Sequence, residues 1–214
     1  MKKNKPENIR KENKMMILDE RSVEMDPFIQ FTKWFEDAST AGISEPNAMF
    51  LATAGADGKP SGRIVLLKEF NRQGFIFYTN YESRKGKEIS ENPNVALTFH
   101  WKELGRQVRI AGTVERVSKK MSDDYFDTRP FGSQLSASIS PQSRVINDRK
   151  FLEELREQFL SGNRNKKITR PEHWGGFLVK PVQFEFWQER ESRLHDRLQF
   201  RREDDRWIIE RLAP

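Results

Sequence analysis

Apolar residues follow the 3.6-residue period of a helix near the start of the chain and the two-residue period of a strand over most of the rest. The helical pattern comprises four residues: Phe28, Phe31, Phe35 and Ala38. Asp26 is a suitable cap and Pro27 suits the first helical position, so we expect one core-facing helix that ends at the Gly42 break. Residues 1–25 are mostly charged and polar without a clear period, which is typical of a mobile arm.

The strand pattern starts at Ala48 and recurs in short runs separated by turn residues. It predicts strands over these ranges: 49–54, 62–70, 75–79, 95–101, 107–117, 178–179, 182–187, a run ending at residue 200, and 207–209. Short turns join the first three strands, which should form an antiparallel meander. Helices are expected to begin at Ser83, Lys119 and Phe151. We therefore expect a mainly β fold with peripheral helices, in a single domain over residues 26–214.

The stretch R-I-V-L-L-K at residues 63–68 places a cation at each end of four apolar residues. Successive side chains of an extended strand point to opposite faces, so Arg63 and Lys68 lie on different faces and need not bind the same anion. Basic groups beside an apolar run suit a phosphate-bearing ligand that lies against a sheet. A buried strand whose charged ends reach solvent is the alternative interpretation of this hexapeptide.

Two further clusters are candidates for anion sites. Ser83 is placed to cap a helix with Arg84 and Lys85 in its first turn. Cations there oppose the helix dipole, which makes sense if they and the free N–H groups share a phosphate, although a solvated charge run is the simpler alternative. Tyr125 and Arg129 lie four residues apart and share a helix face, and we expect Ser133 to follow in a loop after Pro130.

The stretch Arg193-Leu194-His195-Asp196-Arg197 is the least core-like pattern in the chain. If it is extended, its two arginines and its histidine share one face. Two guanidiniums beside an imidazole need an anionic or electron-rich partner if they are buried. Gln107, at the start of a predicted strand, either hydrogen-bonds a heterocycle or is an edge residue.

Composition excludes several classes of site and leaves an anionic ligand open. The 214 residues include 38 Lys and Arg against 32 Asp and Glu, which gives a formal net charge of +6. The chain has no Cys and three His, none at metal-ligand spacing, so we expect neither a thiolate nucleophile nor a metal site. No apolar run approaches the length of a membrane span, and the basic N-terminus lacks the apolar stretch of a signal peptide, so we expect a cytoplasmic protein with no membrane partner.

The positive net charge is also compatible with nucleic-acid binding. Such a domain would cluster its Lys and Arg on one face, with stacking aromatics between them. Here the aromatics follow core periodicity and the acids are interspersed with the bases. A nucleic-acid-binding domain is therefore the least favoured of the hypotheses, and we expect no nucleic-acid partner.

Nine short motifs, in this order, closely resemble the pyridoxine (pyridoxamine) 5′-phosphate oxidase family. They are R-I-V-L-L-K (63–68), F-Y-T-N (77–80), S-R-K (83–85), R-Q-V (106–108), R-P-x-x-S-Q (129–134), W-G-G-F (174–177), E-F-W-Q (185–188), R-L-H-D-R (193–197) and the terminal R-L-A-P. The resemblance runs from about residue 26 to residue 214. Many flavin-binding split barrels share the early strands, whereas R-L-H-D-R points to this oxidase family.

The resemblance implies an antiparallel, FMN-binding split β-barrel that acts as a homodimer with FMN at the subunit interface. It implies oxidation of pyridoxine or pyridoxamine 5′-phosphate to pyridoxal 5′-phosphate, with O2 as acceptor and H2O2 as product. The FMN-binding residues that it implies are Arg63, Ile64, Val65, Leu66, Leu67, Lys68, Tyr78, Thr79, Arg84, Lys85, Gln107, Gln142, Ser143, Trp187 and Arg197. The implied substrate-binding residues are Lys68, Tyr125, Arg129, Ser133, Arg193 and His195, of which Arg193 and His195 would hold the reacting carbon against the flavin.

One departure from the family pattern lies in the N-terminal arm. Family members have an arginine followed three residues later by a tyrosine, and both close over the substrate. Here Arg10 is followed by Asn13, so we expect weaker substrate retention with the chemistry kept. A flavin-binding split-barrel module without oxidase activity is the alternative hypothesis, and it should lack the Tyr125–Arg129–Ser133 and Arg193–His195 sets that are present here.

Overall fold

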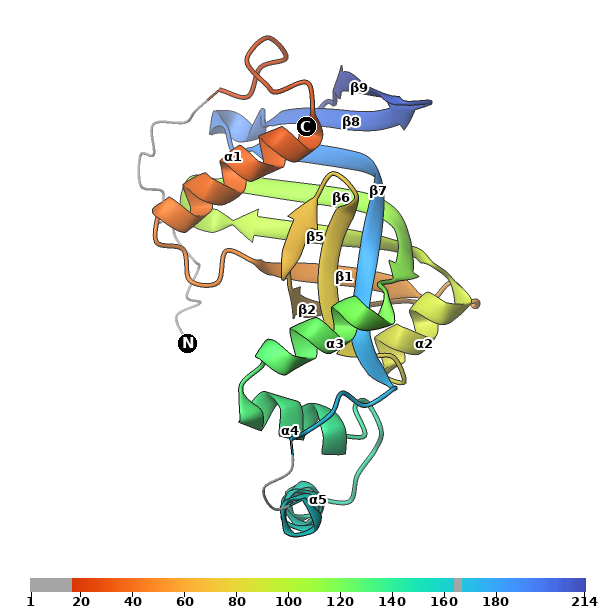
Figure 1. Cartoon of the computed structure of the whole chain (residues 1–214). Coiled ribbons are helices and arrows are strands. Elements are labelled where there is room, and N and C mark those ends of the chain that lie inside the picture. Colours follow the sequence, from red (N-terminus) through yellow and green to blue (C-terminus); the bar gives the residue numbers. More distant parts are fainter. Residues whose placement is uncertain (1–16, 164–166) are drawn as a thin grey trace, which may run out of the picture.

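The computed structural model describes residues 17–163 and 167–214 and consists of a curved antiparallel sheet with helices at its periphery (Figure 1). The strands are β1 (Ala48–Ala54), β2 (Pro60–Leu66), β3 (Glu69–Asn71), β4 (Gly74–Asn80), β5 (Asn94–Trp101), β6 (Arg106–Arg116), β7 (Trp174–Gln188), β8 (Asp196–Glu203) and β9 (Arg206–Arg211). The helices are α1 (Pro27–Thr40), α2 (Arg84–Glu91), α3 (Lys119–Thr128), α4 (Phe131–Ile139) and α5 (Arg149–Gly162), with short 3-10 turns at Lys102–Leu104 and Glu191–Arg193. The mainly β, antiparallel fold that the sequence predicts is confirmed.

The strand order shows how the sheet closes on itself. The order is β2-β1-β5-β6-β7-β4-β3, and β8 pairs with β7 and β9. Its two ends, β2 and β3, are separated in sequence only by Leu67 and Lys68. Because these two residues span so little distance, the sheet curves round until its ends meet, as in a barrel.

Strand β7 belongs to two parts of this sheet. Its first half pairs with β4 and its second half, from Gln183 to Gln188, pairs with β8. A register shift in the pairing of β6 with β7 falls between Ala111 and Gly112. A Cβ atom at Gly112 would lie 2.2 Å from the carbonyl oxygen of Lys180, so only glycine allows the strands to approach here.

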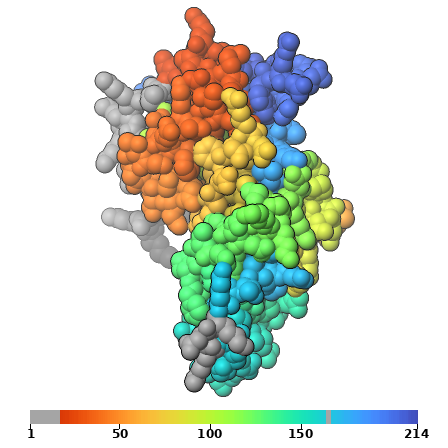
Figure 2. Space-filling view, in the orientation of Figure 1, coloured from red at the N-terminus to blue at the C-terminus, as the bar shows by residue number. Residues whose placement is uncertain are grey.

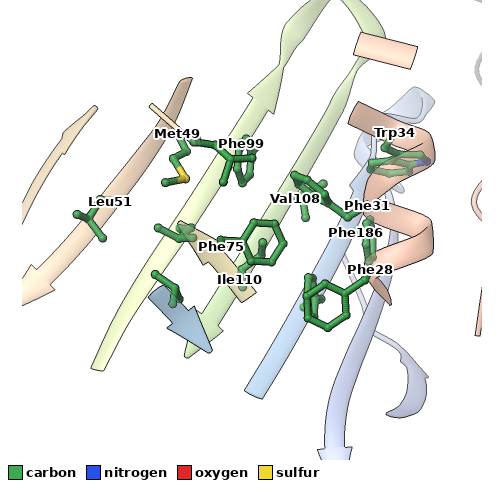
Figure 3. Packing of buried hydrophobic residues seen from close by; sticks show 14 of the residues in the cluster. Phe28, Phe31, Trp34, Met49, Leu51, Phe75, Phe99, Val108, Ile110 and Phe186 are labelled. Carbon is green, nitrogen blue, oxygen red and sulfur yellow. The ribbon is translucent and has the colours of Figure 1, made fainter. Parts of the chain in front are cut away.

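Aromatic residues of α1 pack against buried residues of the sheet in one hydrophobic core, as Figure 3 shows. Phe31 is fully buried and makes edge-on contacts with Phe75 and Phe99, at centroid distances of 4.9 and 5.0 Å. Trp34 packs edge-on against Phe186 at 5.2 Å. The cap at Asp26 is confirmed: its side chain accepts a hydrogen bond from the backbone N–H of residue 28.

A second, smaller hydrophobic cluster packs helices α3 to α5 against the start of β7. These helices form the lower part of the molecule, opposite α1 and the β8–β9 pair (Figures 1 and 2). The buried members of this second cluster are Phe126, Leu135, Ile168 and Trp174. Because Trp174 also opens β7, this cluster joins the helices to the sheet.

Several local predictions are wrong in detail. The single strand expected over residues 62–70 is two strands, β2 and β3, with a break at Leu67–Lys68. β2 pairs with β1 and β3 pairs with β4, so the two lie at opposite ends of the strand order. The expected three-strand meander is therefore interrupted. Ser133, expected in a loop, lies in the first turn of α4. Gln107 is not an edge residue, because β6 lies between β5 and β7.

The arm was expected to extend to residue 25, yet Leu18 and Val23 are buried in the main core. The division into an arm and one domain stays a prediction, and the Arg10–Asn13 departure lies outside the described residues. No helix in the described part of the chain is long and apolar enough to cross a membrane.

Candidate functional site

A cavity of about 870 Å³ opens between β2, β4 and the helices α2 to α4. Most of the sequence-predicted site residues line it: Arg63, Ile64, Val65, Leu66, Lys68, Tyr78, Thr79, Arg84, Lys85, Tyr125, Arg129, Ser133, Gln142 and Ser143. Five of these residues are cationic, and the described residues that line the cavity include no Asp or Glu. Such a wall suits an anionic ligand.

The first group of cations surrounds the carboxylate of Glu88, which the sequence analysis did not single out. Glu88 Oε2 lies 3.2 Å from Arg63 Nη2, and Glu88 Oε1 accepts a hydrogen bond of 2.8 Å from Arg84 Nε. Burial by itself would raise the pKa of Glu88, but hydrogen bonds from Ser61, Thr53, Arg84 and Arg63 outweigh it and hold the pKa at about 2. Glu88 therefore stays ionised and orients both arginines.

Lys85 is the most buried cation of this first group, with 8% of its surface exposed. Its Nζ donates to Thr79 Oγ1 at 3.0 Å, Ser83 Oγ at 3.2 Å and Gln142 Oε1 at 3.4 Å, all of them neutral oxygens. Burial and the nearby Arg63 lower the pKa of Lys85 to about 8. A buried ammonium without a carboxylate partner among the described residues is stabilised when an anion binds beside it.

The start of α2 lies beside these cations. Ser83 caps the helix by accepting a hydrogen bond from the backbone N–H of Gly86, and the first turn contains no acidic residue. A Cβ atom at Gly86 would lie 2.1 Å from the carbonyl oxygen of Tyr81, so glycine lets the helix start close to the preceding turn. The positive end of the helix dipole therefore adds to the charge of Arg84 and Lys85.

The second group of cations consists of Arg129 and Lys68, which also line the cavity, and Arg129 lies on a stack of aromatic rings. The guanidinium of Arg129 lies 4.4 Å from the ring centre of Trp174. Tyr125 stacks on Tyr78 with a centroid distance of 3.9 Å. Within the described residues, the buried Nη1 of Arg129 has no hydrogen-bond partner. Burial lowers the pKa of Arg129, as expected for a cation that lacks a neighbouring anion.

The remaining predicted site residues do not line the cavity. Leu67 is 4% exposed and packs in the hydrophobic core, so its side chain does not line the cavity. Gln107, Trp187 and Arg197 lie side by side on β6, β7 and β8, where Gln107 pairs with Trp187 and Trp187 with Arg197. We call these three residues, together with His195, the C-terminal cluster, and none of them lines the cavity.

His195 packs against Trp187, with ring centroids 4.5 Å apart. Its Nδ1 accepts a hydrogen bond of 3.1 Å from the backbone N–H of Arg190. The extended conformation expected for residues 193–197 is wrong at its start, because Arg193 has φ of 63° and ends a 3-10 turn, and β8 begins only at Asp196. Arg193 is exposed and does not share a strand face with His195 and Arg197.

Sequence reasoning missed three residues that shape these sites: Glu88, Trp174 and Glu185. Glu88 lies four residues after Arg84, a spacing that signals an ion pair on a helix. Trp174 and Glu185 open the motifs W-G-G-F and E-F-W-Q, but no local pattern shows which arginine each one contacts.

Family models match most of the chain. Residues 35–157 match a model described as pyridoxamine 5′-phosphate oxidase, and residues 174–214 match one described as pyridoxine 5′-phosphate oxidase C-terminal dimerisation region. A pyridoxine/pyridoxamine 5′-phosphate oxidase of Nostoc punctiforme is 54% identical over 208 residues, which cover 97% of each chain. The protein with the same name from Salinibacter ruber is 52% identical over 210 residues, covering 97% of this chain and 98% of its own.

Solved structures agree with this assignment. PhzG from Burkholderia lata, in complex with tetrahydrophenazine-1-carboxylic acid, is 28% identical and superposes with a TM-score of 0.87, covering 94% of this chain and 100% of its own. An FMN-binding protein of Nostoc punctiforme, described as pyridoxamine 5′-phosphate oxidase-related, is 17% identical with a TM-score of 0.73, covers 90% of this chain and 100% of its own, and supports the fold alone. The described split-barrel fold and these sequence matches together show that the chain belongs to the pyridoxine/pyridoxamine 5′-phosphate oxidase family.

Proposed function

We propose that the protein is an FMN-dependent oxidase that converts pyridoxine 5′-phosphate and pyridoxamine 5′-phosphate to pyridoxal 5′-phosphate, with O2 as acceptor and H2O2 as product. Relatives more than 50% identical over nearly the whole chain carry this activity in their names. The reaction requires one protein to bind two phosphate-bearing molecules next to each other, the cofactor and the substrate.

The observation that carries the proposal is the unbalanced charge of the cavity. Its five cationic side chains belong to two groups on different elements, and no carboxylate stands among the described residues that line it. Lys85 in the first group is buried, Arg129 is half-buried with its Nη1 atom buried, and neither has an anionic partner within the described residues. Two unneutralised cations that are largely removed from water and lie on separate elements favour two separate phosphates.

The first group fits the phosphate of FMN. Arg63 and Arg84 are held in place by Glu88, Lys85 is buried beside them, and Gln142 lies next to Lys85. We infer that these residues hold the phosphate and that Tyr78 and Thr79 line the flavin. Bound FMN supplies the two-electron acceptor for the oxidation and passes the electrons on to O2.

The second group fits the substrate phosphate. We infer that Arg129, Tyr125 and Ser133 bind it together with Lys68. The cation–π contact with Trp174 holds the Arg129 guanidinium over the indole ring, where it is preorganised for a phosphate. His195 and Arg193 are inferred to orient the pyridine ring, because a reacting carbon must be held in contact with the flavin for the oxidation to proceed.

We further propose that the active form is a homodimer with FMN at the subunit interface. Gln107, Trp187, His195 and Arg197 do not line the cavity of their own chain. A two-fold axis presents the same surfaces of both subunits to each other, so the C-terminal cluster of one protomer can complete the cavity of its partner. The match of residues 174–214 to a dimerisation region supports this arrangement.

An absorbance spectrum of the purified protein, followed by anaerobic addition of pyridoxine 5′-phosphate, tests the function. We expect flavin absorbance that bleaches with the substrate and recovers when air is admitted. Flavin that stays oxidised would instead indicate a flavin-binding module without this activity. A protein that cannot be reconstituted with FMN would contradict both hypotheses. The cytoplasmic location expected from the sequence stays a prediction, and cell fractionation tests it.

A further inference from the structure

Glu185 is a buried carboxylate in the second half of β7, and only 2% of its surface is exposed. Its neighbours in the sheet are Arg109 on β6 and Gln199 on β8. Paired residues of antiparallel strands share a face, and residues two apart on one strand do as well. Glu185 therefore lies on the same face as Trp187 and next to the C-terminal cluster.

An arginine lies beside each carboxylate oxygen of Glu185, but among the described residues only Oε1 has a hydrogen-bond partner. Oε1 accepts a hydrogen bond of 2.9 Å from Arg197 Nε, and Oε2 lies 2.6 Å from Arg109 Nη2. The hydrogen bond that Arg197 donates to Glu185 raises the pKa of Arg197, so the guanidinium stays charged. The two arginines differ in exposure: the side chain of Arg109 is 50% exposed, whereas that of Arg197 is 23% exposed.

The guanidinium of Arg197 is fixed at two of its three nitrogens. Besides the bond from Nε to Glu185, Nη1 donates to the backbone carbonyl of Ala213 at 2.7 Å. Among the described residues no partner is found for Nη2. A planar guanidinium held at two corners has one orientation, so its third nitrogen has a fixed direction in which to bind a ligand.

Stability alone does not explain this buried carboxylate. The free energy lost when a carboxylate leaves water is often as large as what its ion pairs return. Apolar residues of similar volume often stabilise a core equally well. Phe184 and Phe186, the neighbours of Glu185 on β7, are fully buried and already supply the apolar packing of this strand. A carboxylate between them is better explained by the arginine that it orients.

We propose that Glu185 is a positioning residue for flavin binding: it holds the Arg197 guanidinium so that Nη2 binds the ring system of FMN. This inference rests on the proposed function, in which Arg197 contacts the flavin. It adds a residue that does not itself touch the cofactor. Arg109 then serves only to neutralise the second oxygen of Glu185.

A double-mutant cycle on FMN affinity tests the proposal. Full-length protein freed of FMN is titrated with FMN, and binding is followed by quenching of flavin fluorescence. We expect Glu185→Gln, which keeps the size of the side chain and removes its charge, to weaken FMN binding about tenfold, as does the loss of one hydrogen bond to a charged group. In the background of Arg197→Gln, the same substitution should have no further effect, because the residue that Glu185 orients is gone.

Arg109→Gln is the matched control. It removes the other arginine from Glu185 and leaves the bond to Arg197, so we expect FMN affinity to change less than about twofold. Should Glu185→Gln fail to fold, Glu185→Asp makes the same test, since its shorter side chain keeps the charge but draws the carboxylate away from Arg197.

Three outcomes would overturn the inference. The first is an unchanged FMN affinity in Glu185→Gln. The second is a double variant in which the separate losses of affinity caused by Glu185→Gln and Arg197→Gln multiply. The third is a loss of FMN affinity in Arg109→Gln as large as that in Glu185→Gln. A lower melting temperature with unchanged FMN affinity would also show a purely structural role. Failure of the proposed function is distinguishable, because then the unsubstituted protein itself would not bind FMN.

Discussion

The cations that line the cavity and the arginines in and near the C-terminal cluster differ in how completely they are paired with carboxylates. In the cavity, Arg63 and Arg84 pair with Glu88, but the buried Lys85 and the half-buried Arg129 have no carboxylate partner in the described part of the chain. Near the C-terminal cluster, Arg197 pairs with Glu185, and Arg211 pairs with both Glu20 and Asp196. Unneutralised cations suit a site that binds anions, whereas neutralised cations suit a site that holds a fixed shape.

The two regions also lie on different parts of the fold. The cavity is built from elements of the barrel, β2, β4 and α2 to α4, while the cluster lies on the half of β7 that pairs with β8. A phosphate can be held by charge from several directions, but a flat ring requires donors on a rigid surface. The continuous antiparallel sheet under the cluster provides that rigidity.

The largest expected effect comes from mixing two inactive variants, which tests whether both regions form one site across the dimer. One variant carries Arg129→Glu in the cavity and the other carries His195→Ala in the cluster. If each site combines the cavity of one chain with the cluster of its partner, mixed dimers regain one intact site. After denaturation and joint refolding, about a quarter of the wild-type turnover should return, because about half of the dimers are mixed.

Each variant refolded alone is the control for that experiment and should stay inactive. If joint refolding restores no activity although mixed dimers form, the two regions serve separate sites or meet within one chain. The proposed position of FMN at the interface would then be wrong.

A smaller effect is expected for Arg129→Gln, which removes the unneutralised guanidinium of the second cation group. The Michaelis constant for pyridoxine 5′-phosphate should rise about 10- to 100-fold, as for the loss of charged hydrogen bonds, with FMN affinity nearly unchanged. Steady-state kinetics and an FMN titration measure the two quantities. Arg116→Gln is the matched control, because Arg116 stacks on Tyr81 at 4.1 Å but does not line the cavity.

An equal loss of FMN affinity and substrate affinity in Arg129→Gln would contradict the separation of the cavity into two phosphate sites.

The charge of Lys85 should make FMN binding depend on pH. Its pKa in the ligand-free protein is about 8, so it is mainly charged below this value and mainly neutral above it. FMN affinity should therefore fall by up to about tenfold per pH unit above pH 8, because only the charged form attracts the phosphate. Titrations from about pH 7 to about pH 9 measure this, and Lys85→Met should bind FMN weakly with no such dependence.

Riboflavin, which has the same ring but no phosphate, is the control ligand. Its affinity should stay constant over the same range of pH. A parallel decline for riboflavin would show that Lys85 is not the group responsible.

The smallest effect is expected where charges are neutralised and exposed. Arg211 binds Glu20 through two hydrogen bonds of 2.6 and 2.8 Å, which lower the pKa of Glu20 to about 2. A carboxylate with a lowered pKa stabilises the folded state above its unfolded pKa of 4.5 and loses this contribution as the pH falls toward 2. Glu20→Gln should reduce the free energy of unfolding by less than about 1 kcal/mol at neutral pH, because the pair is exposed.

Chemical denaturation at neutral pH and near pH 3 measures this difference, which should shrink in acid. Glu36→Gln is the matched control, since it removes the charge of another exposed glutamate that lies away from Arg211. A difference that grows as the pH falls would contradict the assigned sign.

The sequence by itself determined the elements with a strong period and the family. Helix α1 is predictable because Asp26, Pro27 and the spacing of its phenylalanines all depend on neighbours within a few residues. The strands follow from alternation in the same local way. Most residues that line the cavity are likewise predicted by the ordered motifs that resemble the oxidase family.

Only the tertiary structure decided which charges pair between different elements, whereas the Arg84–Glu88 pair within α2 follows from its spacing of four residues. Arg63 meets Glu88 and Arg197 meets Glu185 across strands and helices that are distant in sequence, so no local spacing reveals these contacts. The tertiary structure also decided the break at Leu67–Lys68. The break separates β2, which pairs with β1, from β3, which pairs with β4 at the other end of the strand order. Burial and ion pairing depend on the packing of distant segments, whereas the period of a strand or helix depends on the chain alone.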